Sequence, residues 1–458
     1  MNTRNVLTSA RIVAAALFVS LFVVACGSSG GSGTDARDQP TTGTVGLLLT
    51  DAATDLYSEI NFVVREAVLI GGDESQEILF DGSEPIDLLD LENFSEPVIF
   101  GEVQAGNYVK LRLMLDDLEL VPYEGEPIHP PMPANGKVDL LAPEGFDVLP
   151  GRTLLITVDV DADKSLKIHT AGNSGRVQFR PVVKAEFSTG DIDPRFDKLV
   201  RLEGAASGDP DLTDGTFVLC DIDSPDYCVD VATDSMTSIF DDEGVGTDLG
   251  TLMDGDMAVV IGEYGTDPIV LNAILLEICG YATLVVGEVV SEPAGGVFLL
   301  LDGDGDDFVV ELQPGFESQP GTLYYDEDGP IDSSAIMLGD EVEVEGVLPA
   351  VEEGEPDLLR AALVFLEAED DDQLSGTIAE PIDDVTMTFV LATYTGDVNV
   401  CVLNDAFILL VDETNAEVTM ATFADLEAGQ VVDVFGMPAA DDSCFEANEI
   451  LVEVPPAE

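Results

Sequence analysis

Hydrophobic and polar residues alternate along most of the chain in short runs, with the period of a half-buried β-strand. In the segment 107–115, every second position from Val109 onward is apolar, and Tyr108, Lys110 and Arg112 occupy the other face. Similar runs rich in β-branched residues are separated by Gly, Pro, Asp and Asn, which favour turns. The pattern predicts an all-β protein with short helices at most.

A glycine pattern occurs three times between residues 199 and 454. The segments GDMAVVIG, GDEVEVEG and GQVVDVFG each place one strand-length run between two glycines, namely Gly255 and Gly262, Gly339 and Gly346, and Gly429 and Gly436. An earlier glycine precedes an aromatic strand start in each copy: Gly204 before Phe217, Gly287 before Phe298, and Gly376 before Phe389. The copies lie further apart than the roughly 20–50 residues of solenoid repeats. They therefore predict three domain-sized repeats.

The N-terminal residues 1–25 have the plan of an export signal. Arg4 and Arg11 lie in a segment without acidic residues, and the apolar run IVAAALFVSLFVVA follows. A positively charged segment before a short hydrophobic run is typical of a signal peptide. The run is shorter than the roughly 20 residues of a membrane-spanning helix. We therefore expect the chain to be exported.

The end of the apolar run, VVAC, resembles the lipobox of bacterial lipoproteins. The matching residues are Val23, Ala25 and Cys26. The resemblance implies cleavage before Cys26 and acylation of that cysteine, and two or more acyl chains suffice for stable anchoring. An ordinary secretory signal cleaved after Ala25 is the alternative. Because Gly27 is not the aspartate that often retains such lipoproteins in the inner membrane, the resemblance favours the outer membrane.

The charge of the chain limits its partners. Its 458 residues include 17 Lys and Arg against 91 Asp and Glu, a net charge of −74. Nucleic-acid binding needs cationic side chains that displace counterions, and too few are present. Anionic membrane surfaces are disfavoured for the same reason, so the N-terminal lipid would hold the protein at the membrane. The acidity favours solubility in saline surroundings, with divalent cation binding as the alternative.

Five cysteines remain after the lipidated one is set aside, in a compartment expected to be oxidising. Two pairs are candidate disulfides: Cys220 with Cys228, which flank the turn-like DIDSPDY, and Cys401 with Cys444, which lie in one repeat. Cys279 is then left over, and we expect a buried thiol near a strand end. No CxxC spacing occurs, so zinc and thioredoxin-like sites lack support.

Two aspartate-rich segments are candidate calcium sites. LLLDGDGDDFVVEL carries Asp302, Asp304 and Asp306 at every second position, as in an EF-hand loop. The match fails where Asp307 replaces the required glycine and Gln313 the required glutamate. The second segment, VDVDADKS, carries Asp159, Asp161 and Asp163 beside Lys164. A turn between strands explains both segments, and weak calcium capture is the alternative.

Catalytic patterns are scarce in the sequence. The only two histidines, His129 and His169, would have to supply any histidine base. No GxSxG, HExxH, Walker or Rossmann fingerprint occurs. A carboxylate pair suited to glycoside hydrolysis would arise by chance among so many acids. Trp is absent, although Tyr324 and Tyr325 could stack on a sugar. A glycan-active hydrolase is therefore the weakest alternative.

The region 44–187 resembles the bacterial domain-of-unknown-function 4382 family. The similar segments are LLLTDAATDLYSEINFVV, IDLLDL, VQAGNYVKLRLML, VDVDADKSLKI and FRPVVKAEF, in the family's order. Ala53 departs from the family's usual proline. The resemblance implies an immunoglobulin- or transthyretin-like β-sandwich after a lipoprotein signal, with no established activity. The three repeats resemble the domain-of-unknown-function 5666 family, which implies small oligonucleotide/oligosaccharide-fold-like barrels.

The expected fold is thus all-β, a sandwich followed by three small barrels. The expected segments are a signal peptide (1–25), a flexible Gly/Ser tether (26–43), a sandwich (44–187), a linker (188–198), barrel-like repeats (199–279 and 280–368), an acidic linker (369–373), a third repeat (374–454) and a tail (455–458).

The expected function is that of a non-catalytic outer-membrane lipoprotein, periplasmic or surface-exposed, acting as a binding, adhesion or spacer module. Its expected partners are the membrane, through the lipid, and a glycan or an envelope protein, with no nucleic acid. A calcium-dependent module that binds a glycan or surface partner is the main alternative, and calcium is the one candidate cofactor.

Overall fold

The fold is taken from a computed structural model, whose described residues all belong to one compact unit, Pro40–Glu458. They form an all-β protein in which the helical segments are short 3-10 turns. These turns are η1 (Leu89–Leu91), η2 (Pro133–Gly136), η4 (Leu249–Thr251), η5 (Ser333–Ala335) and η6 (Phe423–Asp425). The described residues are 41–52, 57, 59–91, 94–122, 126–161, 165–169, 176–179, 182–188, 198–221, 228–266, 269–278, 282–303, 305–326, 329–349, 357–367, 372–412, 417–439 and 443–454.

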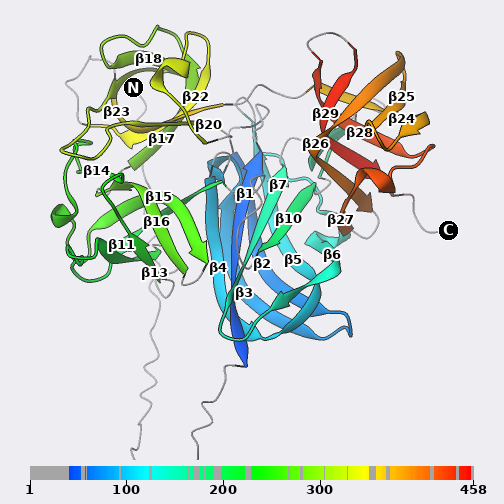
Figure 1. Ribbon diagram of the computed structural model, residues 1–458, viewed down its shortest axis with the longest axis horizontal. Coiled ribbons are helices and arrows are strands. Elements are labelled where there is room, and N and C mark those ends of the chain that lie inside the picture. Colours follow the sequence, from blue (N-terminus) through cyan, green and yellow to red (C-terminus); the bar gives the residue numbers. More distant parts are fainter. Residues whose placement is uncertain are drawn as a thin grey trace, which may run out of the picture. The chain divides into compact units, whose positions relative to one another are not determined.

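The N-terminal part is a β-sandwich. One sheet has the order β10-β7-β1-β4 and the other the order β6-β5-β2-β3, and the strands of the first sheet lie side by side in Figure 1. The first sheet consists of β1 (Thr42–Ala52), β4 (Phe94–Gln104), β7 (Thr153–Asp161) and β10 (Val183–Ser188). The second consists of β2 (Glu59–Gly71), β3 (Gln76–Asp87), β5 (Gly106–Val121) and β6 (Lys137–Val148). A separate pair joins β8 (Leu166–His169) to β9 (Arg176–Phe179).

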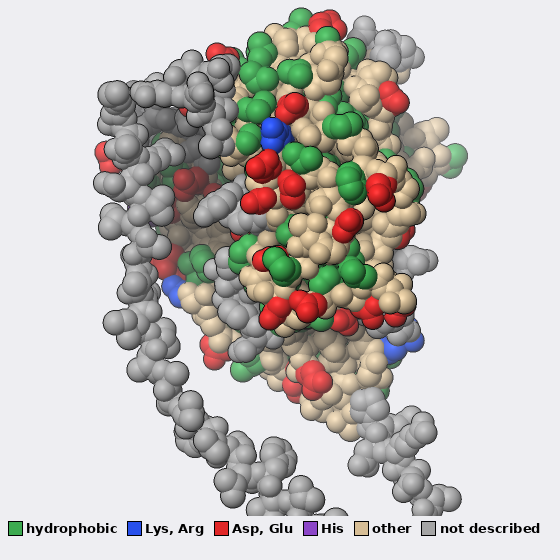
Figure 2. Space-filling model, turned by 90° about the vertical axis from the view of Figure 1, so that its left-hand side faces the viewer, with side chains coloured by type: hydrophobic (Ala, Val, Ile, Leu, Met, Phe, Trp, Pro, Cys, Tyr) green, Lys and Arg blue, Asp and Glu red, His purple; other side chains and the backbone are tan. Residues whose placement is uncertain are grey.

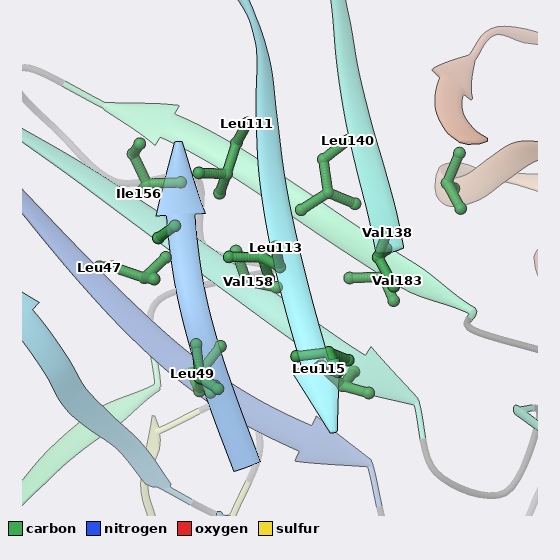
Figure 3. Close-up of a cluster of buried hydrophobic side chains, with 14 of the residues drawn as sticks. Leu47, Leu49, Leu111, Leu113, Leu115, Val138, Leu140, Ile156, Val158 and Val183 are labelled. Carbon is green, nitrogen blue, oxygen red and sulfur yellow. The ribbon is translucent and has the colours of Figure 1, made fainter. Parts of the chain in front are cut away.

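The core of the sandwich lies between the two sheets. Leu47 of β1 and Ile156 of β7 approach Leu111 and Leu113 of β5 from the opposite sheet (Figure 3). All four side chains are buried. Burial of such aliphatic side chains contributes about 1.5–3 kcal/mol each, so the alternation of apolar residues determines which face of each strand turns inward.

The predicted alternation in β5 is wrong at its N-terminal end. Tyr108 is buried, whereas it was expected on the outer face with Lys110 and Arg112. In the pairing of β5 with β2, Gly71 faces Tyr108 and the preceding Ile70 faces Lys110, so Val109 has no partner on β2. A β-bulge at Val109 therefore turns the alternation over by one residue. The Tyr108 hydroxyl donates a hydrogen bond to the carbonyl oxygen of Gln104 at 2.7 Å.

The C-terminal part forms three closed five-stranded barrels, as expected for an oligonucleotide/oligosaccharide-like fold. In each barrel the third and fifth strands pair in parallel. The orders are β11-β12-β13-β16-β15, β17-β18-β19-β23-β22 and β24-β25-β26-β29-β28, each closing on its first strand.

The strands of the barrels have the following bounds. The first barrel uses β11 (Leu199–Ala206), β12 (Thr216–Asp221), β13 (Cys228–Ala232), β15 (Met257–Thr266) and β16 (Ile269–Glu277), with β14 (Ser238–Phe240) beside β16. The second uses β17 (Ala282–Val289), β18 (Val297–Asp302), β19 (Asp307–Leu312), β22 (Glu341–Val347) and β23 (Asp357–Leu366), with β20 (Leu323–Asp326) and β21 (Gly329–Pro330). The third uses β24 (Asp372–Asp383), β25 (Thr388–Thr393), β26 (Gly396–Asp412), β28 (Val431–Pro438) and β29 (Phe445–Glu453), with β27 (Glu417–Ala421).

The repeated glycines have the same structural role in each barrel. A Cβ atom on Gly262 would overlap the carbonyl oxygen of Asn272 on the paired strand, at the point where the register of β15 and β16 shifts. The preceding Gly255 has a φ of 86°, a conformation that glycine adopts without strain. Equivalent overlaps arise at Gly346 and Gly436, and equivalent positive φ angles at Gly339 and Gly429.

Both sheets of the sandwich continue into a barrel. The sandwich strand β4 pairs in parallel with β11 of the first barrel, and β6 pairs in parallel with β27 of the third barrel. Strand edges present unpaired backbone groups, and these pairings cover one edge of each sheet. Among the residues that the structure describes, none forms a helix of the length and apolarity needed to span a bilayer.

Candidate functional site

The candidate calcium ligand Asp159 lies beside a lysine of its own sheet. Lys184 of β10 stands opposite Asp159 of β7 in the register, and its ammonium lies 3.1 Å from the Asp159 carboxylate. The same ammonium lies 2.9 Å from the carboxylate of Glu449 in the third barrel. It also lies 4.7 Å from the centre of the Phe407 ring, within the range of a cation–π contact. The cation beside Asp159 in this structure is therefore the Lys184 ammonium.

The other members of this aspartate cluster are not brought together in the described structure. The side chain of Asp161 and the whole of Asp163 lie outside the described residues. In the part of the chain that is described, no group of three or more His, Cys, Asp or Glu residues is arranged to hold a metal ion. Calcium binding at Asp159 stays a prediction.

The second aspartate cluster forms the turn between β18 and β19. Asp302 Oδ1 accepts a hydrogen bond from the backbone N–H of Asp306 at 2.7 Å, and the N–H of Gly305 donates to the carbonyl oxygen of Asp302 at 3.1 Å. Such side-chain closure is typical of aspartate in turns. Asp304 lies outside the described residues, so calcium binding here also stays a prediction.

The cysteines and histidines have separate positions. Disulfides join Cys220 to Cys228 and Cys401 to Cys444. Cys26 and Cys279 lie outside the described residues. His129 is exposed, with Nε2 3.5 Å from a carboxylate oxygen of Glu119, and the side chain of His169 lies outside the description.

Cations gather around a single buried carboxylate where the sandwich meets the third barrel. Asp139 of β6 accepts two hydrogen bonds from the Arg112 guanidinium, at 2.6 and 2.7 Å. The Lys110 ammonium lies 2.7 Å from Asp139 and 3.3 Å from Glu417 of β27, and that of Lys137 lies 3.3 Å from Asp139. The cluster therefore links strands β5, β6 and β27.

The electrostatics of this cluster favour the charged form of Asp139. Burial raises the pKa of the Asp139 carboxyl, but hydrogen bonds from Arg112 and Lys110 outweigh burial and lower the pKa to about 2. Neither this cluster nor the contacts of Lys184 were predicted from the sequence. The sequence did contain a signal for the cluster. Lys and Arg number only 17 among 458 residues, so basic residues at alternate positions of one strand stand out.

An aliphatic strip is exposed on the second barrel. Val286 of β17 and Leu299 of β18 are each 40% exposed, and Val297 is 37% exposed. Val309 of β19 stands opposite Leu299 in the register and is partly exposed. The exposed acids Glu288 and Asp307 lie on the same two outer strands of the strip, β17 and β19. We call Val286, Val297, Leu299 and Val309 the aliphatic strip.

Exposed acids, Glu288 and Asp307, accompany the strip, and acidic side chains are common on the molecular surface. Figure 2 shows one face of the molecule on which acidic and apolar side chains are interspersed and Lys and Arg are few. The predicted sugar-stacking residues lie elsewhere, because Tyr324 packs against the core of the second barrel and Tyr325 against the contact between the first and second barrels. Burial raises the pKa of both tyrosines. The strip thus offers aliphatic rather than aromatic contacts.

Comparison with known families identifies the sandwich region. Residues 42–181 match the family described as Domain of unknown function (DUF4382). This confirms the resemblance noted over 44–187, with slightly different limits. A search of the curated proteins finds none that matches the chain. The family match covers β1 to β9, so Lys184 and the barrels lie beyond it.

Proposed function

We propose that the chain is a non-catalytic, lipid-anchored protein of the cell envelope that binds a protein partner through its second barrel. The observation that carries the proposal is the aliphatic strip on β17, β18 and β19. In oligonucleotide/oligosaccharide-fold barrels, the face formed by the second and third strands is the ligand-binding face. The strip occupies this face on β18 and β19, and on the first strand Glu288, opposite Leu301, lies between Val286 and the level of Leu299.

The chemistry of the strip selects the class of partner. Exposed aliphatic groups surrounded by carboxylates suit a protein surface that combines apolar and basic side chains, since complementary charges speed association and exclude wrong partners. A nucleic acid would be repelled by the net charge of −74. A glycan would gain little without an exposed aromatic platform on this face. An envelope protein is therefore the partner that we propose.

The anchor is the second part of the proposal. VVAC resembles a lipobox, and acylation of Cys26 would place the folded region on a Gly/Ser tether at the outer membrane. The three barrels would belong to the domain-of-unknown-function 5666 family, which their common glycine positions support. Strand pairing joins the first and third barrels to the sandwich, and the second barrel, which carries the strip, packs against the first barrel.

Photo-crosslinking in cells tests the binding face. A photoreactive amino acid at Leu299 of the full-length chain is expected to give a discrete crosslinked adduct, because the side chain would face the partner. The matched control is the same probe at Leu212, an exposed leucine of the first barrel. Equal crosslinking at both positions, or none at Leu299, would argue against the strip as the binding face.

Metabolic labelling tests the anchor independently. A palmitate analogue is expected to label the wild-type protein and to leave Cys26→Ser unlabelled. Cys220→Ser is the control, since it changes another cysteine and retains the lipobox. A freely secreted, unlabelled wild-type product would overturn the anchoring proposal and leave the crosslinking test unaffected.

A further inference from the structure

The first and second barrels meet through apolar outer faces. Val259 and Ile261 of β15 and Leu275 of β16 pack in one buried cluster with Ala362 and Leu363 of β23. These side chains point away from the interiors of their own barrels, because their neighbours in the strands fill those interiors. We call this contact the barrel joint.

A buried ion pair crosses the barrel joint. The Arg201 guanidinium of β11 donates two hydrogen bonds to Glu345 of β22, with Nε at 3.0 Å from one carboxylate oxygen and a terminal nitrogen at 3.2 Å from the other. The Glu345 side chain is completely buried. Such a two-pronged contact is the strong geometry for arginine and a carboxylate, so Glu345 is the partner that Arg201 neutralises.

A second carboxylate lies in the same joint without a cation of its own. Glu277, the last residue of β16, is 0% exposed. Neither of its carboxylate oxygens has a hydrogen-bond partner among the described residues. Two ionised carboxylates cannot hydrogen-bond to each other, because neither has a proton to donate. A proton on Glu277 would supply the missing donor toward Glu345.

The remaining neighbours do not balance the second charge. Across the strand pairing, Glu277 faces Val259 of β15 and Phe240 of β14. The charged and titratable groups of the elements around it are Arg201 and Glu203 on β11, Glu263 on β15, Tyr325 on β20, Glu343 and Glu345 on β22, and Asp357 and Arg360 on β23. Arg201 and Arg360 are the cations among them, and Arg360 is engaged elsewhere, with Nε 3.1 Å from the Glu311 carboxylate and a terminal nitrogen that donates to the carbonyl oxygen of Glu243.

We propose that the barrel joint holds one proton on Glu277 and that release of this proton loosens the contact between the first and second barrels. An ionised carboxylate in apolar surroundings is strongly unfavourable without a partner. The joint therefore closes in the protonated state, with Glu277 donating to Glu345 and Glu345 accepting from Arg201. Proton release adds a second negative charge beside Glu345 and favours separation of the two faces.

The direction of the effect follows from the titration of Glu277. Burial raises the pKa of Glu277 well above its ordinary value, and the neighbouring Glu345 carboxylate raises it further. The closed joint then binds a proton that the open joint releases. Above the ordinary pKa of a glutamate, about 4.3, the stability of the closed joint falls as the pH rises, until Glu277 ionises in the closed state.

Amide hydrogen exchange of the full chain at pH 6 to 9, corrected for the intrinsic pH dependence of exchange, tests the proposal. In the wild type, protection of β16 and β22 is expected to fall with rising pH, by at most about tenfold per pH unit for one proton. Protection of β29 in the third barrel reports on global unfolding. In Glu277→Gln, whose amide can donate to Glu345 at every pH, protection of β16 and β22 should not vary with pH.

Two further variants complete the test. Glu345→Gln also leaves one carboxylate for Arg201, so its joint should be independent of pH. Glu288→Gln removes an exposed acid of β17, and the protection of β16 and β22 in this variant should depend on pH as it does in the wild type. Parallel pH dependence in the wild type and Glu277→Gln would overturn the proposal, as would a wild-type slope that persists in Glu345→Gln.

Discussion

The Lys184 ammonium lies 2.9 Å from the carboxylate of Glu449 and joins the sandwich to the third barrel. It also contacts Asp159, and all three side chains are buried. Replacing both partners of a buried ion pair by apolar residues is often tolerated, but removal of a single partner is strongly destabilising. Loss of Lys184 alone is therefore expected to destabilise the fold.

Lys184→Met is expected to lower the free energy of unfolding by about 3–5 kcal/mol, because Asp159 and Glu449 lose the ammonium that both contact. Urea unfolding followed by tyrosine fluorescence measures the change. Arg65→Met is the control, because Arg65 and Asp117 form an exposed pair that is expected to contribute less than about 1 kcal/mol. Equal losses in the two variants would contradict the role given to Lys184.

Asp139 is expected to contribute to stability at neutral pH and to lose this contribution in acid. Its pKa in the folded state is about 2, below the roughly 3.9 of an unfolded aspartate, so the contribution is complete above that ordinary value and disappears as the pH falls through 2. The shift corresponds to about 2–3 kcal/mol. Unfolding of the wild type and Asp139→Asn at pH 5 and pH 2 measures it. If the difference in unfolding free energy between the two proteins were as large at pH 2 as at pH 5, the assignment would be contradicted.

The two disulfides are expected to contribute unequally. Cys220 and Cys228 are separated by 8 positions, and Cys401 and Cys444 by 43. Since a longer closed loop restricts the unfolded chain more, loss of the second disulfide should cost about 1.5 kcal/mol more than loss of the first. Paired Cys→Ala variants compared by denaturant unfolding give the two values. The reverse order would show that native-state effects outweigh loop length.

Gly262→Ala is expected to destabilise the first barrel by about 1–3 kcal/mol, since the added Cβ would overlap the Asn272 carbonyl oxygen. Gly72→Ala is the control: its Cβ would be 3.8 Å from Val109, an ordinary contact. Thermal unfolding of the two variants measures the difference. If both alanines were tolerated alike, the close approach of the strands could not explain the repeated glycine.

Short-range patterns were sufficient to predict much of the architecture. Alternation predicted the strands, and the equally placed glycines predicted three similar barrels, because both depend on residues near one another in the chain. The face predicted for Tyr108 was wrong because one inserted residue, Val109, reverses the alternation. No spacing rule marks that bulge in advance.

The contacts between the sandwich and the barrels, and between one barrel and another, could not be predicted from the sequence. In EVEVEG the acids at Glu343 and Glu345 look like the solvent face of a strand, yet they are 2% and 1% exposed, because another barrel covers that face. Alternation distinguishes the two faces of a strand and does not say what covers the outer one. Lys110 and Glu417 are likewise 307 positions apart in the chain, and their contact depends on the assembled fold.

The parallel pairings of β4 with β11 and of β6 with β27 mean that the limits of the family match are not limits at which the chain can be cut. A fragment ending after β10 would expose two bare strand edges, and bare edges recruit strands from other molecules. Such a fragment should form oligomers or fibrils where the full chain remains dispersed. We therefore expect the first and third barrels to cover the edge strands β4 and β6 and so to prevent the sandwich from pairing with other copies of the chain.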